Sequence, residues 1–234
     1  MNRLLLPLIA VCLVFCAATA ASANDNANLW VIHGIPGKDL KLDPRLPVDI
    51  KVNGKGTLAG FTFGKIAGPL SVPPGSYKIE IAPANKTKPY SEKPIIVATI
   101  KLGLKENAVA IAHLDAKGGA TASKFTQDFS RTKWLNTRVI AHHTANAPAV
   151  DVKLKRLGWW RGKELAFENV TNGGQAAVEI FTGFWAVGVF PAGKPMPVLQ
   201  VKGPAIPRFT YSIFVVGSLE NETLAFILLP YRTR

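Results

Sequence analysis

The sequence predicts an all-β protein made of two tandem Ig-like antiparallel β-sandwich domains. Short runs that alternate polar and apolar residues, such as Ser76–Ile81 and Val150–Leu154, are typical of strands with one buried face. Turn residues separate these runs, and no segment after residue 23 shows a sustained apolar helical face. The same order of runs occurs twice, so we expect two domains of about 100 residues each.

The first 23 residues predict a secretory signal peptide. A charged start at Arg3 precedes the apolar run Leu4–Phe15, and the segment ends in the small residues Ala21-Ser22-Ala23. The apolar run is too short to span a bilayer, which needs about 20 residues. We therefore expect cleavage before Asn24, export to the periplasm or the cell exterior, and no transmembrane segment in the mature chain.

The two cysteines, Cys12 and Cys16, both lie in this predicted signal peptide. The mature chain would then have no disulfide, no thiolate metal ligand and no cysteine nucleophile. A second interpretation makes Cys16 a lipidated residue that anchors the protein. The bulky Phe15 before it fits a lipoprotein signal poorly, so we favour cleavage after Ala23.

The chain is strongly basic, with 28 Lys and Arg against 15 Asp and Glu and a formal net charge of +13. Loss of Arg3 with the signal peptide leaves +12, which is 27 − 15. Such an excess attracts anionic glycans, lipid headgroups or other envelope surfaces, and export argues against nucleic acid as a partner. Because the basic residues are spread along the chain, a surface that is merely basic is the competing interpretation.

The first domain is expected to span residues 24–133. The pair Asn53-Gly54 predicts a tight hairpin turn, because both residues tolerate positive φ. Pro73-Pro74-Gly75 predicts another turn, directly before the strand Ser76–Ile81. The last strand of this domain is expected within Ala122–Phe129.

The second domain, residues 134–234, is expected to repeat this order. Pro191-Ala192-Gly193 predicts one of its turns, and its final strand is expected within Glu222–Tyr231. A linker of only a few residues, near Ser130–Asn136, joins the two domains. Because the linker is short, we expect little relative motion and a pair that behaves as one elongated rod.

Several stretches of both halves resemble one known family. The first half has a His-x-x-Pro pattern from His33, followed by Val-Asp, and the stretch FGKIAGPLSVPPGSYKIEIAPA from Phe63. The second half has VTNGGQAAVEIFTGFWAVGVFPAG from Val170. These stretches are similar to the domain-of-unknown-function family DUF4397, in two tandem copies. The first copy departs from the pattern by the insertion Lys38–Leu46, and the second by Phe167-Glu168 in place of Phe-Gly. The resemblance implies an exported or cell-surface β-sandwich module with no known enzyme activity.

The four histidines are candidate metal ligands. We interpret His33 and His142 as equivalent residues at the end of the first strand of each domain, with His143 adjacent and His113 near the end of a later strand. They form no set at metal-ligand spacing. We therefore expect hydrogen bonds that fix loops, and neither a metal nor another cofactor.

Asp49 and Asp151 lie on alternating strands, where aspartate is unfavourable. We expect each carboxylate to accept hydrogen bonds from the backbone of the preceding Pro-containing loop. The alternatives are an oxygen ligand beside His33 or His142, or an acid–base group, which needs a second carboxylate that neither domain offers. The sequence also lacks a G-x-S-x-G elbow and a phosphate loop, so we expect no enzyme activity.

The stretch KRLGWWRGK, residues 155–163, is the strongest candidate for a binding site. The residues predicted to contact a ligand are Lys155, Arg156, Trp159, Trp160, Arg161 and Lys163. Aromatic rings flanked by cations suit sugar faces, a bilayer interface or an acidic glycan. In the alternative, Trp159 or Trp160 packs across the junction between the domains, against Trp134 or Phe125.

These observations together predict a non-catalytic, exported binding or surface-interaction protein. It would contact a glycan, an envelope component or a partner protein. The alternative is a structural subunit or scaffold of an extracellular assembly, in which exposed strand edges pair with a partner or a second copy.

Overall fold

The computed structural model describes residues 25–158 and 164–233. Strands dominate it, as predicted. The first eight strands and one 3-10 helix are β1 (Ala27–His33), η2 (Gly37–Leu40), β2 (Val48–Val52), β3 (Lys55–Phe61), β4 (Ile66–Val72), β5 (Gly75–Pro83), β6 (Ile96–Leu102), β7 (Asn107–Leu114) and β8 (Ala120–Thr126). The last eight are β9 (Asn136–His143), β10 (Val150–Leu157), β11 (Glu164–Val170), β12 (Gln175–Phe181), β13 (Gly183–Pro191), β14 (Leu199–Ala205), β15 (Phe209–Val216) and β16 (Ala225–Arg232).

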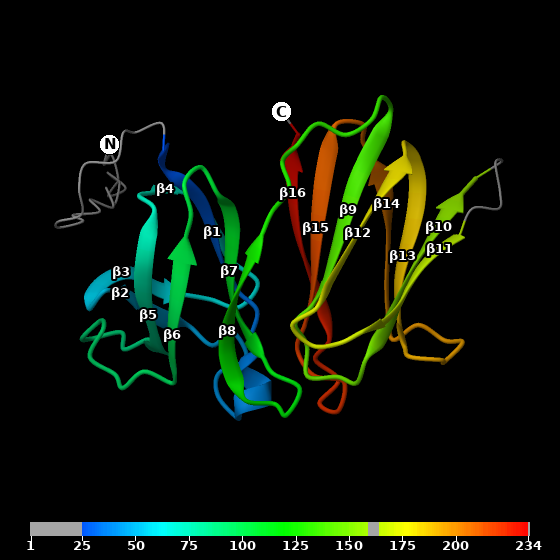
Figure 1. Cartoon of the computed structure of the whole chain (residues 1–234). Helices are drawn as coiled ribbons and strands as arrows, with labels where there is room; N and C mark the ends of the chain where they lie inside the picture. The colour runs from blue at the N-terminus through cyan, green and yellow to red at the C-terminus, as the bar shows by residue number, and fades with distance from the viewer. Residues whose placement is uncertain (1–24, 159–163, 234) are drawn as a thin grey trace, which may run out of the picture.

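The strands form four sheets that pair into two sandwiches (Figure 1). In the first sandwich, an inner sheet β4-β1-β7-β8 packs on an outer sheet β3-β2-β5-β6. The second repeats this arrangement, with an inner sheet β12-β9-β15-β16 and an outer sheet β11-β10-β13-β14. This confirms the predicted all-β sandwich fold. Each inner sheet also contains one parallel pair, β1–β7 and β9–β15, which the antiparallel prediction did not include.

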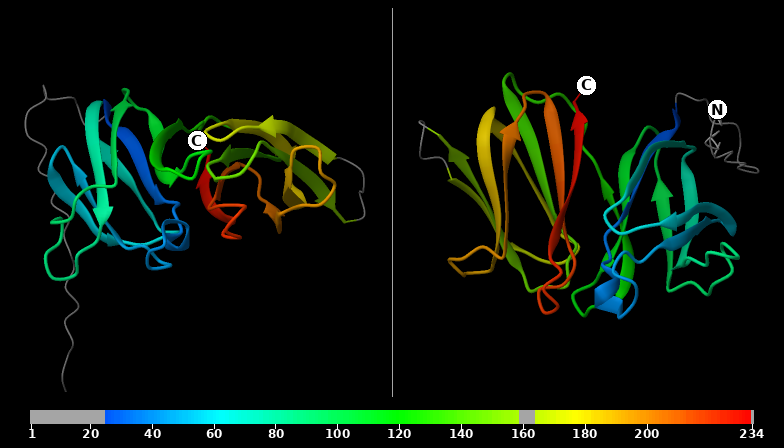
Figure 2. Two further views of the ribbon diagram at one scale, coloured as in Figure 1. Left: turned by 90° about the horizontal axis from the view of Figure 1, so that it is seen from below. Right: turned by 180° about the vertical axis from the view of Figure 1, so that it is seen from behind.

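The two inner sheets pack against each other, so the sandwiches lie face to face in four layers (Figure 2). Trp30 and Ile32 of β1 point across this interface, while their neighbours Leu29 and Val31 point into the first sandwich. From the second sandwich, Phe214 of β15 is fully buried in the same cluster. The remaining buried members are Val109, Ile111, Phe125, Val216, Ile227, Leu229 and Tyr231. The prediction of an elongated rod is therefore wrong, because the two sandwiches pack face to face.

The continuous apolar runs of the inner strands explain this packing. Leu29–Ile32 and Ile213–Val216 are apolar at every position, rather than at every second position. A strand with this composition buries both of its faces. Its second face is covered here by the other sandwich.

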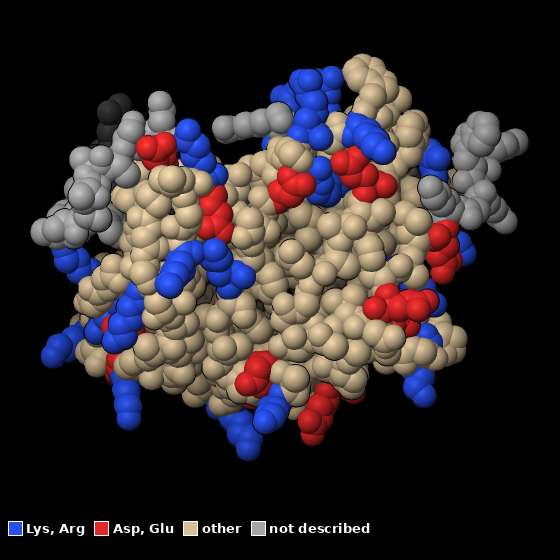
Figure 3. Space-filling model, in the orientation of Figure 1, with Lys and Arg blue, Asp and Glu red and all other residues tan. Residues whose placement is uncertain are grey.

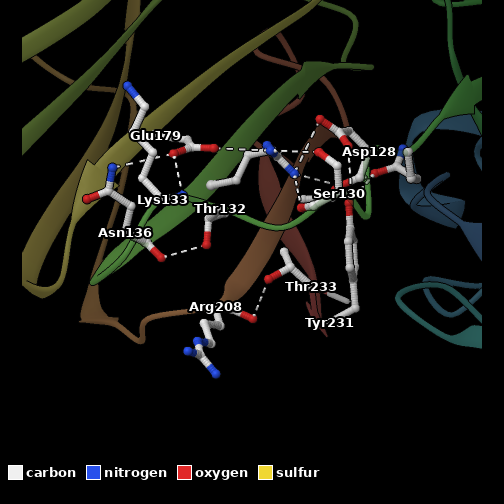
Figure 4. Close-up of polar contacts among 12 residues, drawn as sticks. Asp128, Ser130, Thr132, Lys133, Asn136, Glu179, Arg208, Tyr231 and Thr233 are labelled. Carbon is white, nitrogen blue, oxygen red and sulfur yellow. Dashed lines mark hydrogen bonds and ion pairs between the residues drawn. The ribbon is translucent and has the colours of Figure 1, made fainter.

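The linker between β8 and β9 is held by the buried guanidinium of Arg138 on β9. Arg138 donates to the carbonyl oxygens of Asp128 (3.0 Å) and Ser130 (2.9 Å). Its other terminal nitrogen pairs with the carboxylate of Glu179 on β12 at 3.1 Å. Glu179 also accepts a bond from the Lys133 backbone N–H (Figure 4). The linker is thus fastened to the second sandwich along its length.

A second set of polar contacts joins the sandwiches at the opposite end of the interface. The helix η2 overlaps the start of the insertion Lys38–Leu46. Its Asp39 carboxylate accepts hydrogen bonds from the Thr223 hydroxyl (2.7 Å) and the Asn221 amide (2.9 Å). Lys38 donates to the Asn221 carbonyl at 3.1 Å. The insertion that departs from the family pattern is therefore an interdomain contact.

Asp49 and Asp151 occupy equivalent places and anchor strand bulges. Asp49 accepts from the N–H groups of Gly60 (2.9 Å) and Tyr90 (2.7 Å). Asp151 accepts from Asn169 and Gly193, both at 3.0 Å. The donors are backbone groups, as expected, but they belong to later segments and not to the preceding Pro-containing loop. The pairing register shifts beside both aspartates, so each carboxylate satisfies an N–H that a bulge releases from the ladder.

The structure corrects the predicted equivalence of His33 and His142. His33 bonds the Leu46 carbonyl (2.8 Å) and accepts from the Ile35 N–H (3.3 Å), and so fixes the loop after β1. In the second sandwich, the same two bonds are made by His143, to Pro148 and Ala145. His143 is therefore the equivalent of His33.

His142 instead lies in the interface between the sandwiches. Its ring stacks on Phe214 with centroids 4.2 Å apart, and meets the edge of Phe125 at 4.7 Å. Both ring nitrogens are buried without a hydrogen-bond partner among the described residues. Burial away from water lowers the pKa of His142 from its ordinary 6.5 to about 3.

We predict that replacing Asp151 by alanine destabilises the second sandwich. The backbone N–H groups of Asn169 and Gly193 lose their acceptor, and each of these part-buried hydrogen bonds contributes about 0.5–1.5 kcal/mol to the free energy of unfolding. Urea unfolding of the Asp151→Ala variant should show this loss, and Asp49→Ala should show a similar one. Glu220→Ala, which removes an exposed carboxylate, is the control. Equal stability of Asp151→Ala and Glu220→Ala would contradict the anchoring role.

We also predict that His142 makes the fold sensitive to acid. The unfolded chain binds a proton at this residue below pH 6.5, whereas the folded chain does so only near pH 3. The free energy of unfolding therefore falls as the pH drops from 6.5 towards 3, by up to about 1.4 kcal/mol per pH unit from this group. His142→Leu should be at least as stable at pH 7 and lose less stability on acidification. Unchanged pH dependence in this variant would refute the prediction.

Candidate functional site

A groove crosses the outer face of the sheet β11-β10-β13-β14 in the second sandwich. It has a volume of about 430 Å³. Its floor is formed by Ala186 and Gly188 of β13. Its two walls are Lys153 and Lys155 of β10 on one side, and Gln200 and Lys202 of β14 on the other. We call this feature the lysine groove.

The strand register places these residues together. Lys155 pairs with Ala186, and Ala186 pairs with Lys202, so two lysines flank one small residue across the sheet. In the next row, Gly188 lies between Lys153 and Gln200. Because side chains on one face of a strand repeat every second residue, these six positions share the outer face.

The equivalent face of the first sandwich is filled. Where the second sandwich has Ala186 and Gly188, the first has Lys78 and Glu80, whose charged groups pair at 2.7 Å. This pair covers the middle strand β5 with long side chains. The groove therefore depends on two small residues that only the second copy of the fold has at these positions.

One end of the groove is formed by the ring of Phe190. A Cβ atom on Gly188 would lie 2.8 Å from this ring, so glycine allows the ring to lie close against the strand. The Nζ atom of Lys153 is 4.9 Å from the ring centroid. Pro195 and Pro197 complete this end. The groove thus offers an aromatic surface next to a cation.

The three groove lysines are not neutralised by ion pairs to carboxylates in the part of the chain that the structure describes. Glu164 of β11 also lines the groove, opposite Lys155 in the register. The lining therefore has three cations and one carboxylate. Uncompensated cations around a concave surface raise the local concentration of anions.

The charged side chains are dispersed on the face of the molecule drawn in Figure 3. On the face shown in Figure 3, Lys and Arg side chains lie mostly around the rim of both sandwiches, with uncharged surface between them. This agrees with the spread of basic residues along the sequence. The net charge alone therefore does not mark a site.

The residues of the stretch 155–163 that were predicted to contact a ligand do not all lie at the groove. Lys155 lies in the groove. Arg156 belongs to the other face of β10, where it donates to the Thr182 carbonyl at 3.2 Å and lies over the Phe181 ring. The other predicted contacts, Trp159, Trp160, Arg161 and Lys163, lie outside the described residues.

The alternative packing partners of those tryptophans have different environments. Phe125 is buried in the interface between the sandwiches, against His142 and Phe214. Trp134 is 73% exposed, with the Arg208 guanidinium 5.4 Å from its ring centroid.

The sequence motifs did not indicate Lys153, Gln200 and Lys202 as site residues. The available signal was the alternation in VKLK and LQVKG, which places polar side chains two residues apart on one face. Their convergence depends on β10 and β14 both pairing with β13, and these strands are far apart in the sequence.

The residues considered for metal or acid–base chemistry have structural partners or lie apart. His113 bonds the Ser123 hydroxyl and the Leu114 carbonyl, both at 2.9 Å. Within residues 25–158 and 164–233, no three His, Cys, Asp or Glu side chains are grouped as a metal site would require. Nor does any helix in these ranges have the length and apolar character to cross a bilayer.

Comparisons with solved structures give only distant similarities. The Bacillus anthracis TIE protein is 11% identical with a TM-score of 0.28; the match covers 82% of this chain, which spans only 34% of that protein. A Bacteroides uniformis protein described as a candidate cell adhesion protein is 8% identical with a TM-score of 0.30, and covers 89% and 99% of the two chains. The family CBM26 module of Eubacterium rectale Amy13K, solved with maltoheptaose, is 8% identical with a TM-score of 0.25, and covers 88% and 97%. These scores are too low to support an argument about function.

The chain matches no curated protein. The sequence pattern of a family described as a domain of unknown function (DUF4397) matches residues 27–153, from the start of β1 to the middle of β10. One match of this extent leaves the second tandem copy a prediction, although the strand order itself repeats. Because the matched segment covers more than half of the sequence, the chain belongs to the DUF4397 family.

Proposed function

We propose that this protein is a non-catalytic binding protein whose lysine groove takes an acidic glycan. The observation that carries the proposal is the replacement of the Lys78–Glu80 pair of the first sandwich by Ala186 and Gly188 in the second. This difference opens a concave surface and leaves three lysines around it.

The chemistry of the lining supports a glycan over a simple ion. The lysines suit carboxylate or sulfate groups, Gln200 can donate to and accept from hydroxyls, and the Phe190 ring offers an apolar face for a sugar ring. An open groove on a flat sheet also suits an extended polymer.

The proposed setting is the periplasm or the cell surface. The signal-peptide pattern of residues 1–23 supports it, and acidic glycans are common in such surroundings. A binding role for Trp159, Trp160, Arg161 and Lys163 stays a prediction of the sequence.

Heparin, as an acidic-glycan probe, tests the proposal. We expect saturable binding that weakens with added salt, because exposed charges are screened. The variant Lys153→Ala/Lys202→Ala should bind about two- to thirtyfold more weakly, since each exposed charge contact contributes about 0.2–1 kcal/mol. Calorimetry or surface plasmon resonance would measure this loss, with neutral dextran as the comparison ligand.

Two further variants separate the groove from net charge. Lys51→Ala/Lys101→Ala removes the same charge from the outer face of the first sandwich and should bind heparin as the wild type does. Ala186→Lys/Gly188→Glu/Phe190→Ala copies the residues of the first sandwich, including Ala82 in place of Phe190, and leaves net charge unchanged. It should lose binding. Equal losses from the lysine pairs of both sandwiches would show that the affinity reflects charge alone.

A further inference from the structure

An apolar cleft opens at one edge of the second sandwich, between the edge strands β14 and β16. It has a volume of about 300 Å³ and runs between the two sheets. Its interior residues are Val139, Ile180, Trp185, Val187 and Ile213. Val201 of β14 and Leu228 of β16 form its rim and are 41% and 46% exposed. The core of the first sandwich contains a cavity of only about 60 Å³.

One cause of the cleft is a missing side chain at Gly203. In the first sandwich, Tyr77 of β5 pairs with Ile100 of β6, which is buried. In the second, the equivalent Trp185 pairs with Gly203. A Cβ atom built on Gly203 meets no atom within 4 Å, so the space that Ile100 occupies in the first sandwich is empty in the second.

The other cause is the loss of a bridge between the edge strands. In the first sandwich, Lys124 of β8 donates to the Lys101 carbonyl of β6 at 2.8 Å and pairs with Glu106 at 2.7 Å. These contacts hold β8 beside β6. The equivalent residue of β16 is Leu228, because Lys124 pairs with Ala110 and Leu228 pairs with Ile213 at matching register positions. A leucine cannot make this bridge, and the edge stays open.

The lining indicates the ligand. The interior is almost entirely apolar, whereas Lys202 lies at the mouth, where it also forms part of the lysine groove. We propose that the cleft holds the acyl chain of an anionic amphiphile, with Lys202 beside its charged head. The apolar interior, together with Lys202 as the one cation among the described lining residues, matches one chain and one head group. This inference goes beyond the proposed glycan binding and does not depend on it.

Isothermal titration with dodecanoate below its micelle concentration tests the proposal. We expect a single class of sites with a negative heat-capacity change, the mark of apolar burial. Gly203→Ile, which restores the residue of the first sandwich, should weaken binding at least about tenfold by filling the cleft. Its thermal stability should equal or exceed that of the wild type, because the side chain enters empty space.

Ligand controls separate the chain from the head group. Butanoate, which has the same head group on a short chain, should not bind measurably. Dodecyl maltoside, which has a neutral head group, should bind the wild type about two- to fivefold more weakly than dodecanoate does. The two ligands should bind Lys202→Ala with the same affinity, because this variant lacks the cation that favours the carboxylate. Vesicles of phosphatidylglycerol, added in parallel, distinguish a membrane lipid from a free fatty acid as the source of the chain.

Three results would overturn the inference. The first is that the wild type binds neither dodecanoate nor vesicles. The second is that the wild type and Gly203→Ile bind dodecanoate with equal affinity. The third is that the wild type forms a dimer which Gly203→Ile abolishes, while neither protein binds dodecanoate. The last result would assign the cleft to a second copy. Heparin binding should be unchanged in Gly203→Ile, so a failure here leaves the proposed glycan binding separately testable.

Discussion

The packing of the two inner sheets against each other is the contact on which the rest of the structure depends. Strands β1 and β15 are apolar on both faces, and a sandwich covers only one face of each sheet. The second face would be exposed in an isolated sandwich, at a cost of roughly 1.5–3 kcal/mol for each large side chain. Interdomain packing therefore stabilises both sandwiches. It also withdraws the facing surfaces of the inner sheets from contact with ligands.

The polar groups within this contact give it a defined geometry. Arg138 donates hydrogen bonds to the linker carbonyls, and Asp39 accepts a hydrogen bond from Thr223 in the loop before β16. The sheets are therefore held together at both ends. His142 is the exception, because burial leaves its two nitrogens unpaired and lowers its pKa. The same interface thus holds the two sandwiches together and contains the histidine whose pKa burial lowers most clearly.

The two sandwiches have the same strand order but have diverged in side-chain volume. The first has long side chains across its outer face and a closed edge, through Lys78, Glu80, Ile100 and Lys124. The second has smaller or apolar residues at these positions and so has a groove and a cleft. Atoms that line such open space lose van der Waals contacts, which lowers the stability of the fold.

The sequence by itself determined the local features: the strand class, the Asn53-Gly54 turn with both residues at positive φ, and the paired roles of Asp49 and Asp151. These follow from alternation and turn chemistry, which depend on neighbouring residues. Only the tertiary structure decided which histidine matches His33, how the sandwiches pack, and that Lys153, Lys155 and Lys202 meet around Ala186. Those features depend on which distant strands pair and in what register. Alternation shows which residues share a face, but not which strand lies beside them.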